Sequence, residues 1–300
     1  MRHLLLLLLC AGSLPAQTRF ILDADTANEI DDLYAIAYLF AEESITWEGL
    51  NSAQWYHYKS GDSTVYQSQH LNEELLTLAG RTDLPHPLGA DTIMGEPWGG
   101  YQPRNSPAAQ FIIEQARQGA SSGGGAAGAE KVVVMCIGAS TNLASAIALA
   151  PDIKDKIVAY VLGFQYDTAG GYWNKDEFNI RRDLNAANYL LNAEGLELHV
   201  MPTTTAIQYT WQRDSTFARL DRSGPIGEYL KRRWQTNATG DKERVMWDVA
   251  ALQAFLKPGQ ATEIEVDTPP ENSRRKVWVY TDIDEEAMQR DYWDRLTTYR

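Results

Sequence analysis

The chain has 300 residues, of which 44% are hydrophobic and 22% charged, an ordinary globular composition that excludes wholesale disorder. Forty acidic residues against 27 basic ones give a formal net charge of −13, which repels phosphate backbones and argues against a nucleic-acid polymer as partner. No apolar run reaches the roughly 18 residues that a membrane span needs.

The N-terminal segment has the pattern of a secretory signal peptide. Arg2 and His3 precede a leucine run at 4–9, and small residues follow as far as Ala16. We therefore expect export to the periplasm or the extracellular space after cleavage near Ala16, which leaves one domain over residues 17–300. Cys136 is then the single thiol of the mature chain, within an apolar run that predicts a buried strand.

Apolar runs alternate with helical patterns along the rest of the chain. The predicted strands are 19–22, 45–50, 131–137, 157–162, 198–201 and 276–280. The predicted helices are 31–43, 67–79, 107–118, 142–150, 185–193, 226–234 and 245–256. Apolar strands that alternate with helices predict an α/β fold, an open and mostly parallel (mixed) sheet flanked by helices. The glycine-rich stretch 121–128 lacks the ending of a P-loop and predicts a flexible surface connection.

The end of the first predicted strand carries the densest acidic segment of the sequence. It contains five carboxylates within ten residues, namely Asp23, Asp25, Glu29, Asp31 and Asp32. Ligands of open α/β sheets bind beyond the carboxyl ends of the strands. Two carboxylates about 4 Å apart repel by roughly 4 kcal/mol at an effective dielectric of about 20, so the cluster needs a protonated member or a bound cation. All-oxygen ligands favour a hard ion, Ca²⁺ or Mg²⁺.

Known acidic motifs differ in how well they fit this segment. An EF-hand wants an acid or amide and then glycine where Ala27 and Asn28 stand. A haloacid-dehalogenase phosphatase also opens with Asp-x-Asp, but Ala27 occupies its usual Thr or Val position. The segment more closely resembles the nucleoside hydrolase signature, in which Asp-x-Asp is followed shortly by Asp-Asp-Ala or a variant. The connecting loop is two residues longer here than in the commonest form.

Four further segments resemble the nucleoside hydrolase family in its own order. They are Gly49-Leu50-Asn51, Gly138-Ala139-Ser140-Thr141-Asn142-Leu143-Ala144, Glu177-Phe178-Asn179 with Asp183 after it, and Trp247-Asp248-Val249-Ala250. The resemblance covers roughly residues 18–260, and it is to the Ca²⁺-dependent, inosine- or uridine-preferring type. Since family members are usually dimers or tetramers, it also implies a homo-oligomer.

The resemblance implies an enzyme that hydrolyses the N-glycosidic bond of ribonucleosides or related ribosides with inversion. A single Ca²⁺ would be held by Asp25, Asp32, the Thr141 carbonyl and Asp248. Asp25 would also be the catalytic base that activates a water on that ion. The substrate-binding residues would be Asp31, Asn51, Glu177, Asn179 and Asp248, with Glu177 at the 5′-hydroxyl.

The leaving-group side departs from the family pattern. Trp247 stands where many members have a histidine acid, and an indole N–H cannot serve as a general acid. His57 in the aromatic run 54–58 is the remaining candidate there, and this run, Trp173 or Trp211 would stack on a base. Two other functions stay open, a Ca²⁺-dependent sugar- or nucleoside-binding protein without turnover and a Mg²⁺-dependent phosphatase with Asp23 or Asp25 as nucleophile.

Overall fold

The computed structural model of the chain describes residues 17–119 and 131–298. The predicted signal peptide and the glycine-rich stretch 121–128 lie outside these residues. Within the described ranges, no helix combines the length and the apolar character that crossing a bilayer requires.

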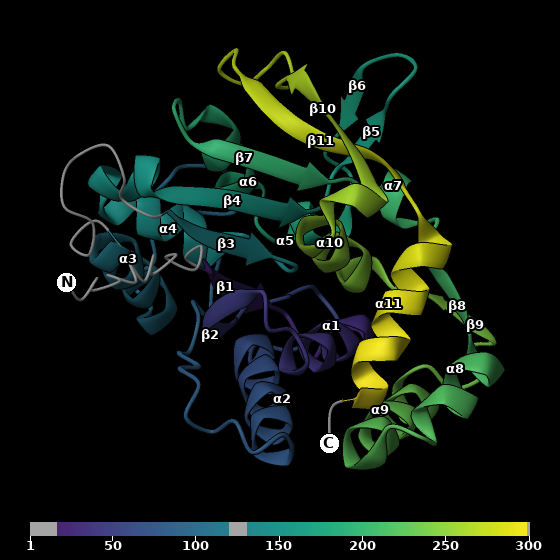
Figure 1. Cartoon of the computed structure of the whole chain (residues 1–300). Helices are drawn as coiled ribbons and strands as arrows, with labels where there is room; N and C mark the ends of the chain where they lie inside the picture. Colours follow the sequence, from purple (N-terminus) through teal and green to yellow (C-terminus); the bar gives the residue numbers. More distant parts are fainter. Residues whose placement is uncertain (1–16, 120–130, 299–300) are drawn as a thin grey trace, which may run out of the picture.

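A seven-stranded sheet runs through the molecule in the order β10-β11-β7-β4-β3-β1-β2 (Figure 1). Its strands are β1 (Thr18–Ala24), β2 (Ile45–Ser52), β3 (Val132–Cys136), β4 (Ile157–Leu162), β7 (Glu197–Met201), β10 (Ala261–Asp267) and β11 (Lys276–Ile283). Neighbouring strands are parallel except for β10, which pairs antiparallel with β11 at the edge. Two hairpins stand apart from the sheet, β5 (Gln165–Asp167) with β6 (Tyr172–Asn174) and β8 (Thr210–Gln212) with β9 (Glu243–Val245).

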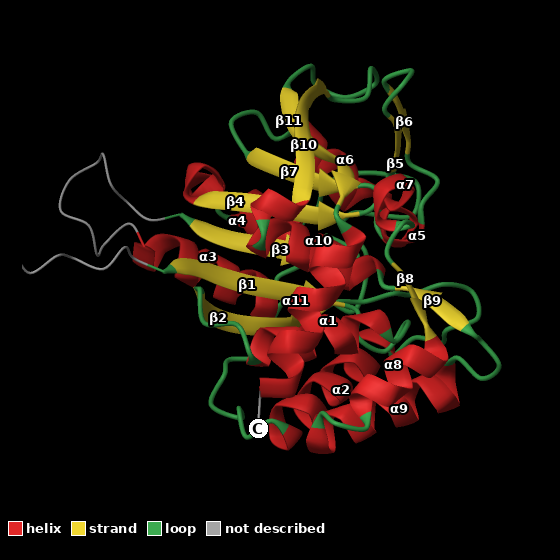
Figure 2. Cartoon of the chain, turned by 45° about the vertical axis from the view of Figure 1, so that its right-hand side comes forward, coloured by secondary structure: helices red, strands yellow, loops and turns green. Residues whose placement is uncertain are grey.

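Helices cover both faces of this sheet, because successive strand residues point to opposite sides. In β1, Phe20 and Leu22 join one apolar cluster and Ile21 joins the other. On the Ile21 side lie α3 (Pro107–Gly119), α4 (Thr141–Leu149) and α6 (Leu184–Asn192). The opposite side holds α1 (Asp31–Phe40), α2 (Thr64–Leu78), α8 (Arg213–Leu220), α9 (Gly224–Asn237), α10 (Trp247–Leu256) and α11 (Glu285–Thr298) (Figure 2). The predicted α/β fold class is confirmed.

Shorter helices connect these elements. They are α5 (Phe178–Arg182), α7 (Thr203–Ala206) and the 3₁₀ turns Pro151–Lys156 and Pro258–Gln260. Each predicted strand and helix corresponds to an element of the structure, with ends that differ by a few residues. The first strand runs on to Ala24, so Asp23 belongs to the sheet. Val245 was predicted as helical but ends β9, because its backbone pairs with Thr210.

Residues 261–267 and 285–298 form β10 and α11, for which no element was predicted. Acidic residues alternate along β10, as expected at a partly exposed sheet edge. In α11 the buried positions are Met288, Tyr292, Trp293 and Leu296, and charged residues occupy much of the rest. The helix therefore has few apolar residues, although these recur at helical spacing and belong to the core.

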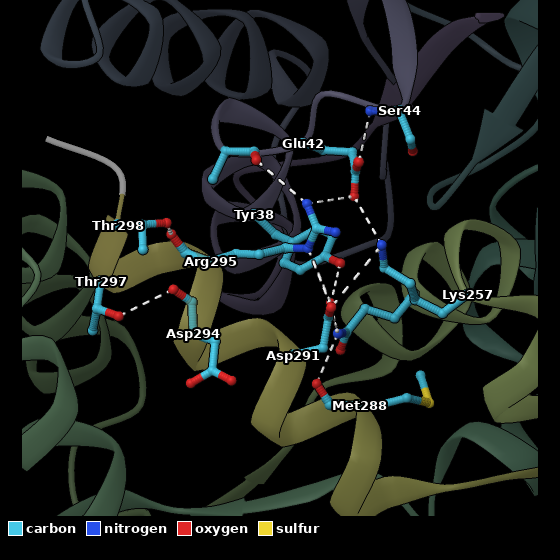
Figure 3. Close-up of polar contacts among 12 residues, drawn as sticks. Tyr38, Glu42, Ser44, Lys257, Met288, Asp291, Asp294, Arg295, Thr297 and Thr298 are labelled. Atoms are coloured by element: carbon cyan, nitrogen blue, oxygen red, sulfur yellow. Dashed lines mark hydrogen bonds and ion pairs between the residues drawn. The ribbon is translucent and has the colours of Figure 1, made fainter. Parts of the chain in front are cut away.

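A polar network attaches α11 to the end of α1 (Figure 3). The Glu42 side chain is only 1% exposed, and its Oε2 lies 3.0 Å from Arg295 Nη1 and 3.4 Å from Lys257 Nζ. Asp291 Oδ1 accepts from Arg295 Nε at 3.2 Å. Burial opposes ionisation of Glu42, but hydrogen bonds from Ser44 and the two cations hold the pKa of its carboxyl below the usual value.

Aromatic packing beside this network makes α11 part of the core. The Trp211 ring centroid lies 4.7 Å from that of Tyr292 and 5.0 Å from that of Trp293. Trp211 is 1% exposed, so the prediction that it stacks on a nucleobase is wrong. Its place in β8 directs the ring toward α1 and α11, where it meets Tyr34 edge-on.

We expect Trp293→Ala to lower the free energy of unfolding by about 3–5 kcal/mol, because it leaves a cavity beside Trp211. Arg290→Ala on the exposed side of α11 is the matched control and should change stability by less than about 0.5 kcal/mol. Urea denaturation followed by far-UV circular dichroism measures both. A loss below about 1 kcal/mol for Trp293→Ala would show that α11 is not part of the cooperative core.

Candidate active site

An acidic cavity of about 320 Å³ lies at the carboxyl-terminal edge of the sheet. The arrowheads of β3, β4 and β7 point toward this edge (Figure 1). Seven acidic side chains line the cavity, namely Asp25, Glu29, Asp31, Asp32, Asp176, Glu177 and Asp248. Open α/β sheets bind their ligands at this position.

The loop after β1 and the start of α1 bring the first of these carboxylates together. Asp25 follows β1 directly, and its carbonyl accepts from Asn28 N at 2.8 Å in a tight turn. A Cβ at Gly138 would lie 2.8 Å from the Asp25 side chain, so this close approach requires glycine there. Asp31 and Asp32 form the first turn of α1, where the helix dipole favours negative charge.

The carboxylates of Asp31, Asp32 and Asp248 form a close triad. One oxygen of each lies within 4.8 Å of the others, and all three residues are buried. Asp248 lies in the first turn of α10, and its backbone N–H donates to Asp31 Oδ2 at 3.2 Å. Two helix N-termini thus meet at the triad and partly offset its charge.

The cavity contains carboxylate oxygens that no described group satisfies. Asp25 Oδ2 and Asp32 Oδ1 are both buried without a hydrogen-bond partner. Buried anions need a counter-ion or a proton, and an all-oxygen set suits a hard cation. The residues present therefore fit a metal ion. Asp25 lines the same cavity but is not a member of the close triad. Asp31, which was predicted to bind the sugar, is a member of it.

Burial and mutual repulsion raise the pKa of every carboxyl in this group. Burial, with repulsion from Glu29, raises the pKa of Asp31 to about 7. Burial, then repulsion from Asp32 and Asp31, raises the pKa of Asp25 well above its usual value. The pKa of Asp248 rises for the same reasons, burial first and then Asp31 and Asp32. Without a cation, protons would have to neutralise part of the cluster at neutral pH.

Glu177 and Asn179 face the same cavity from the start of α5. Glu177 is the N-cap of that helix, and its side chain accepts from Ile180 N at 3.2 Å. Asn179 Nδ2 donates to the carbonyls of Ile137 at 2.8 Å and Leu162 at 3.2 Å, just beyond β3 and at the end of β4. Both side chains are therefore held in place by backbone groups while they line the cavity.

Asn51 and Thr141 are not among the residues that line the acidic cavity. Asn51 is fully buried in β2 and pairs in register with Asp23 of β1. Thr141 opens α4, and its Oγ1 donates to Asp183 Oδ2 at 2.7 Å. The predicted roles of these two residues stay predictions.

Asp23 lies in the sheet and not on the cavity wall. It is fully buried, and its Oδ1 accepts from Asn142 Nδ2 at 2.8 Å. Burial raises the pKa of its carboxyl to about 7. Nothing in this arrangement presents Asp23 to a phosphoryl group, so a phosphatase that uses Asp23 as nucleophile gains no support.

Asp176 and Arg181 were not predicted as site residues. Both line the acidic cavity, one on each side of the Glu-Phe-Asn motif in the chain, together with Phe178 of the motif itself. Asp183, which was noted only as part of that motif, accepts from Met94 N at 2.7 Å and Ala186 N at 2.9 Å. Proximity to a recognised motif was the available signal for these residues.

The leaving-group candidates separate in space. Trp247 is half-buried and lines the acidic cavity, whereas His57 lines a second cavity beside it. No histidine is among the described residues that line the acidic cavity. Trp173 packs edge-on against Phe164 and Tyr166 and lines neither cavity.

Comparison with known sequences identifies the family of the chain. The family model described as "Inosine-uridine preferring nucleoside hydrolase" matches residues 20–290. The chain belongs to the nucleoside hydrolase family. Nucleoside hydrolases cleave the N-ribosyl bond of nucleosides and depend on a metal, which fits the buried acidic cluster. No curated protein sequence matches the chain.

Solved structures share the fold of this nucleoside hydrolase at low sequence identity. A plant nucleoside hydrolase is 19% identical with a TM-score of 0.70, over 93% of this chain and 99% of its own. An inosine-guanosine nucleoside hydrolase is 17% identical with a TM-score of 0.72, over 94% and 99%. A purine-preferring ribonucleoside hydrolase from Gardnerella vaginalis is 18% identical with a TM-score of 0.67, over 94% and 99%. These likenesses show a common fold.

The raised pKa of Asp31 predicts how stability depends on pH when no cation is bound. Its folded value of about 7 exceeds the unfolded value of about 4, so the folded state binds the proton more tightly. Stability is then fully present below the unfolded pKa and is lost as the pH rises toward 7. We expect protein treated with EDTA to melt at a higher temperature at about pH 5 than at about pH 8.

Calorimetry at matched ionic strength measures this difference. Added Ca²⁺ should raise the melting temperature more at the higher pH, and Asp31→Asn should flatten the dependence in EDTA. A metal-free protein that melts at the same or a higher temperature at the higher pH would contradict the predicted repulsion.

Proposed function

We propose that this chain is an exported, Ca²⁺-dependent hydrolase that cleaves the N-glycosidic bond of a ribonucleoside or related riboside with inversion at C1′. One observation carries the proposal. Buried carboxylates from the β1 loop, α1 and α10 converge with Glu177 and Asn179 in one cavity. Family membership supplies the class of reaction, and this cavity supplies groups of the right chemistry for it.

The cation would be held by Asp25, Asp32, Asp248 and the Thr141 carbonyl. Support comes from the unpartnered buried oxygens of Asp25 and Asp32, because oxygen ligands of this kind favour Ca²⁺ or Mg²⁺ over softer ions. When bound, Ca²⁺ supplies positive charge that orients sugar hydroxyls and eases deprotonation of the attacking water.

Asp25 acts as the general base. It accepts the proton of the attacking water while the water oxygen forms a bond to C1′. The C1′–N bond breaks, and the nucleobase departs with the electron pair of that bond. The other carboxylates stabilise the positive charge that develops on the sugar ring. Because no carboxylate attacks C1′, a single displacement inverts that centre.

The sugar would be positioned by side chains of the same cavity. Asp31 and Asn179 would hold ring hydroxyls and Glu177 the 5′-hydroxyl. Asn51 is the weaker candidate for this sugar contact, because its side chain is buried in β2 and does not line the cavity. The backbone bonds of Glu177 and Asn179 restrict their rotamers, so the sugar meets a preorganised surface.

Trp247 determines whether the departing nucleobase can be protonated by the enzyme. Its indole N–H can donate a hydrogen bond but cannot transfer a proton. A purine or pyrimidine must then take its proton from another source, whereas a nitrophenolate leaves without one. The enzyme should therefore favour ribosides with good leaving groups.

The test is turnover of p-nitrophenyl β-ribofuranoside by residues 17–300 with Ca²⁺ present. Asp25→Asn should lower kcat by about 10²–10⁴-fold, since it removes the proton acceptor and keeps the size of the side chain. Asp294→Asn, an exposed position on α11, is the matched control and should keep full activity. No turnover by a folded, Ca²⁺-loaded wild type would refute the hydrolase and leave a sugar-binding protein.

A further inference from the structure

A second cavity of about 550 Å³ adjoins the acidic one. Arg181 lines both cavities, so they share a wall at α5. Three aromatic side chains of the second cavity are unusually exposed, Tyr56 at 49%, Tyr58 at 85% and Trp98 at 85%. Large aromatic surfaces gathered at a cavity and left open to solvent indicate a place where a flat ring can stack.

Basic side chains dominate the same wall. Arg181 Nη1 lies 2.7 Å from Asp176 Oδ1, and both side chains are more than half exposed, so this ion pair is weak and exchangeable. Arg182 Nη1 donates to the Tyr56 carbonyl at 2.9 Å, and its guanidinium lies 4.7 Å from the centre of the Phe178 ring. Arg182 is thus held in place by Tyr56 and Phe178 where it lines the second cavity.

The acid that lines this cavity, Asp183, has its hydrogen bonds with groups other than the two arginines. Asp183 Oδ2 accepts from Met94 N and from Thr141 Oγ1, both at 2.7 Å, and Oδ1 accepts from Ala186 N at 2.9 Å. Its carboxylate is engaged inside the fold. In a chain of net charge −13, an acidic cavity thus shares a wall with a basic, aromatic one.

We propose that the second cavity binds a phosphate carried on the 5′-oxygen of the ribosyl substrate, together with an aromatic group esterified to that phosphate. The proposal rests on the proposed function, which places the 5′ end of the sugar near Glu177. On a 5′-phosphoryl substrate there is no 5′-hydroxyl for Glu177 to hold, and Arg181 would contact the group on the 5′-oxygen instead. Arg181 follows Glu177 by one turn of α5, on the side of the second cavity. Arginine forks match phosphate oxygens, and Tyr58 and Trp98 offer faces for the ring beyond. The preferred substrate is then an anionic 5′-phosphoryl riboside and not a plain nucleoside.

Binding calorimetry with a graded series of probes tests this without turnover. The probes are ribose, ribose 5-phosphate and the phenyl ester of ribose 5-phosphate, each titrated into residues 17–300 with Ca²⁺. We expect about a tenfold or larger gain in affinity for the phosphate and a further gain of about tenfold for the phenyl ring.

Matched variants separate recognition from general loss of structure. Arg182→Gln and Arg181→Gln should each weaken ribose 5-phosphate binding about tenfold. Asp176→Asn should strengthen it, because Arg181 loses its competing carboxylate. Opposite signs from the two members of one ion pair cannot arise from unfolding. Trp98→Ala should reduce the gain from the phenyl ring and leave the gain from the phosphate.

Equal affinity of the wild type for ribose and ribose 5-phosphate would overturn the inference. Unchanged phosphate affinity in the folded Arg181→Gln, Arg182→Gln double variant would do so as well. Hydrolysis of the neutral p-nitrophenyl riboside reports the proposed function separately. Phosphate-selective binding without any hydrolysis would therefore refute the proposed hydrolase activity and support phosphate binding in the second cavity.

Discussion

The site is governed by the cost of holding several carboxylates together away from water. Asp25, Asp31, Asp32 and Asp248 are nearly fully buried, and two of them have oxygens without any partner. Such a group is unfavourable as bare anions, so protons or a cation must accompany it in the folded state. The same charge that makes the metal-free site costly is what favours a hard cation and a developing positive charge on a sugar.

The rest of the fold keeps that group assembled. β1 places Asp25 at the edge of the sheet, and α1 and α10 direct their N-termini at the same point. Both helices pack against one another and against α11, which the Glu42 network and the Trp211 cluster attach to them. The C-terminal segment thus contributes to the site without lining it, because it limits how far α1 and α10 can move apart.

The sequence predicted the parts of the site where a local apolar pattern and a family motif coincide. The acidic loop, the Glu-Phe-Asn turn and Asp248 come together because each follows an apolar run or opens a helix, and such positions meet at one sheet edge. Trp211 was misjudged because an aromatic residue carries no signal of which partners it will meet. β10 and α11 lie beyond the recognised motifs, which end near residue 260, and the apolar spacing of the two elements was not used. The place of Arg181 in the wall of a second cavity depends on residues 93 and 97–99, which lie far away in the sequence.

The most direct test of the central claim is the number of calcium ions bound per chain. Equilibrium dialysis of residues 17–300 against radioactive calcium gives this number without any assumption about substrate. We expect one ion per chain for the wild type and for Asp294→Asn, and loss of binding in Asp32→Asn and Asp248→Asn, both still folded. No bound calcium in the wild type, or full binding in both buried variants, would contradict a cation site formed by these carboxylates.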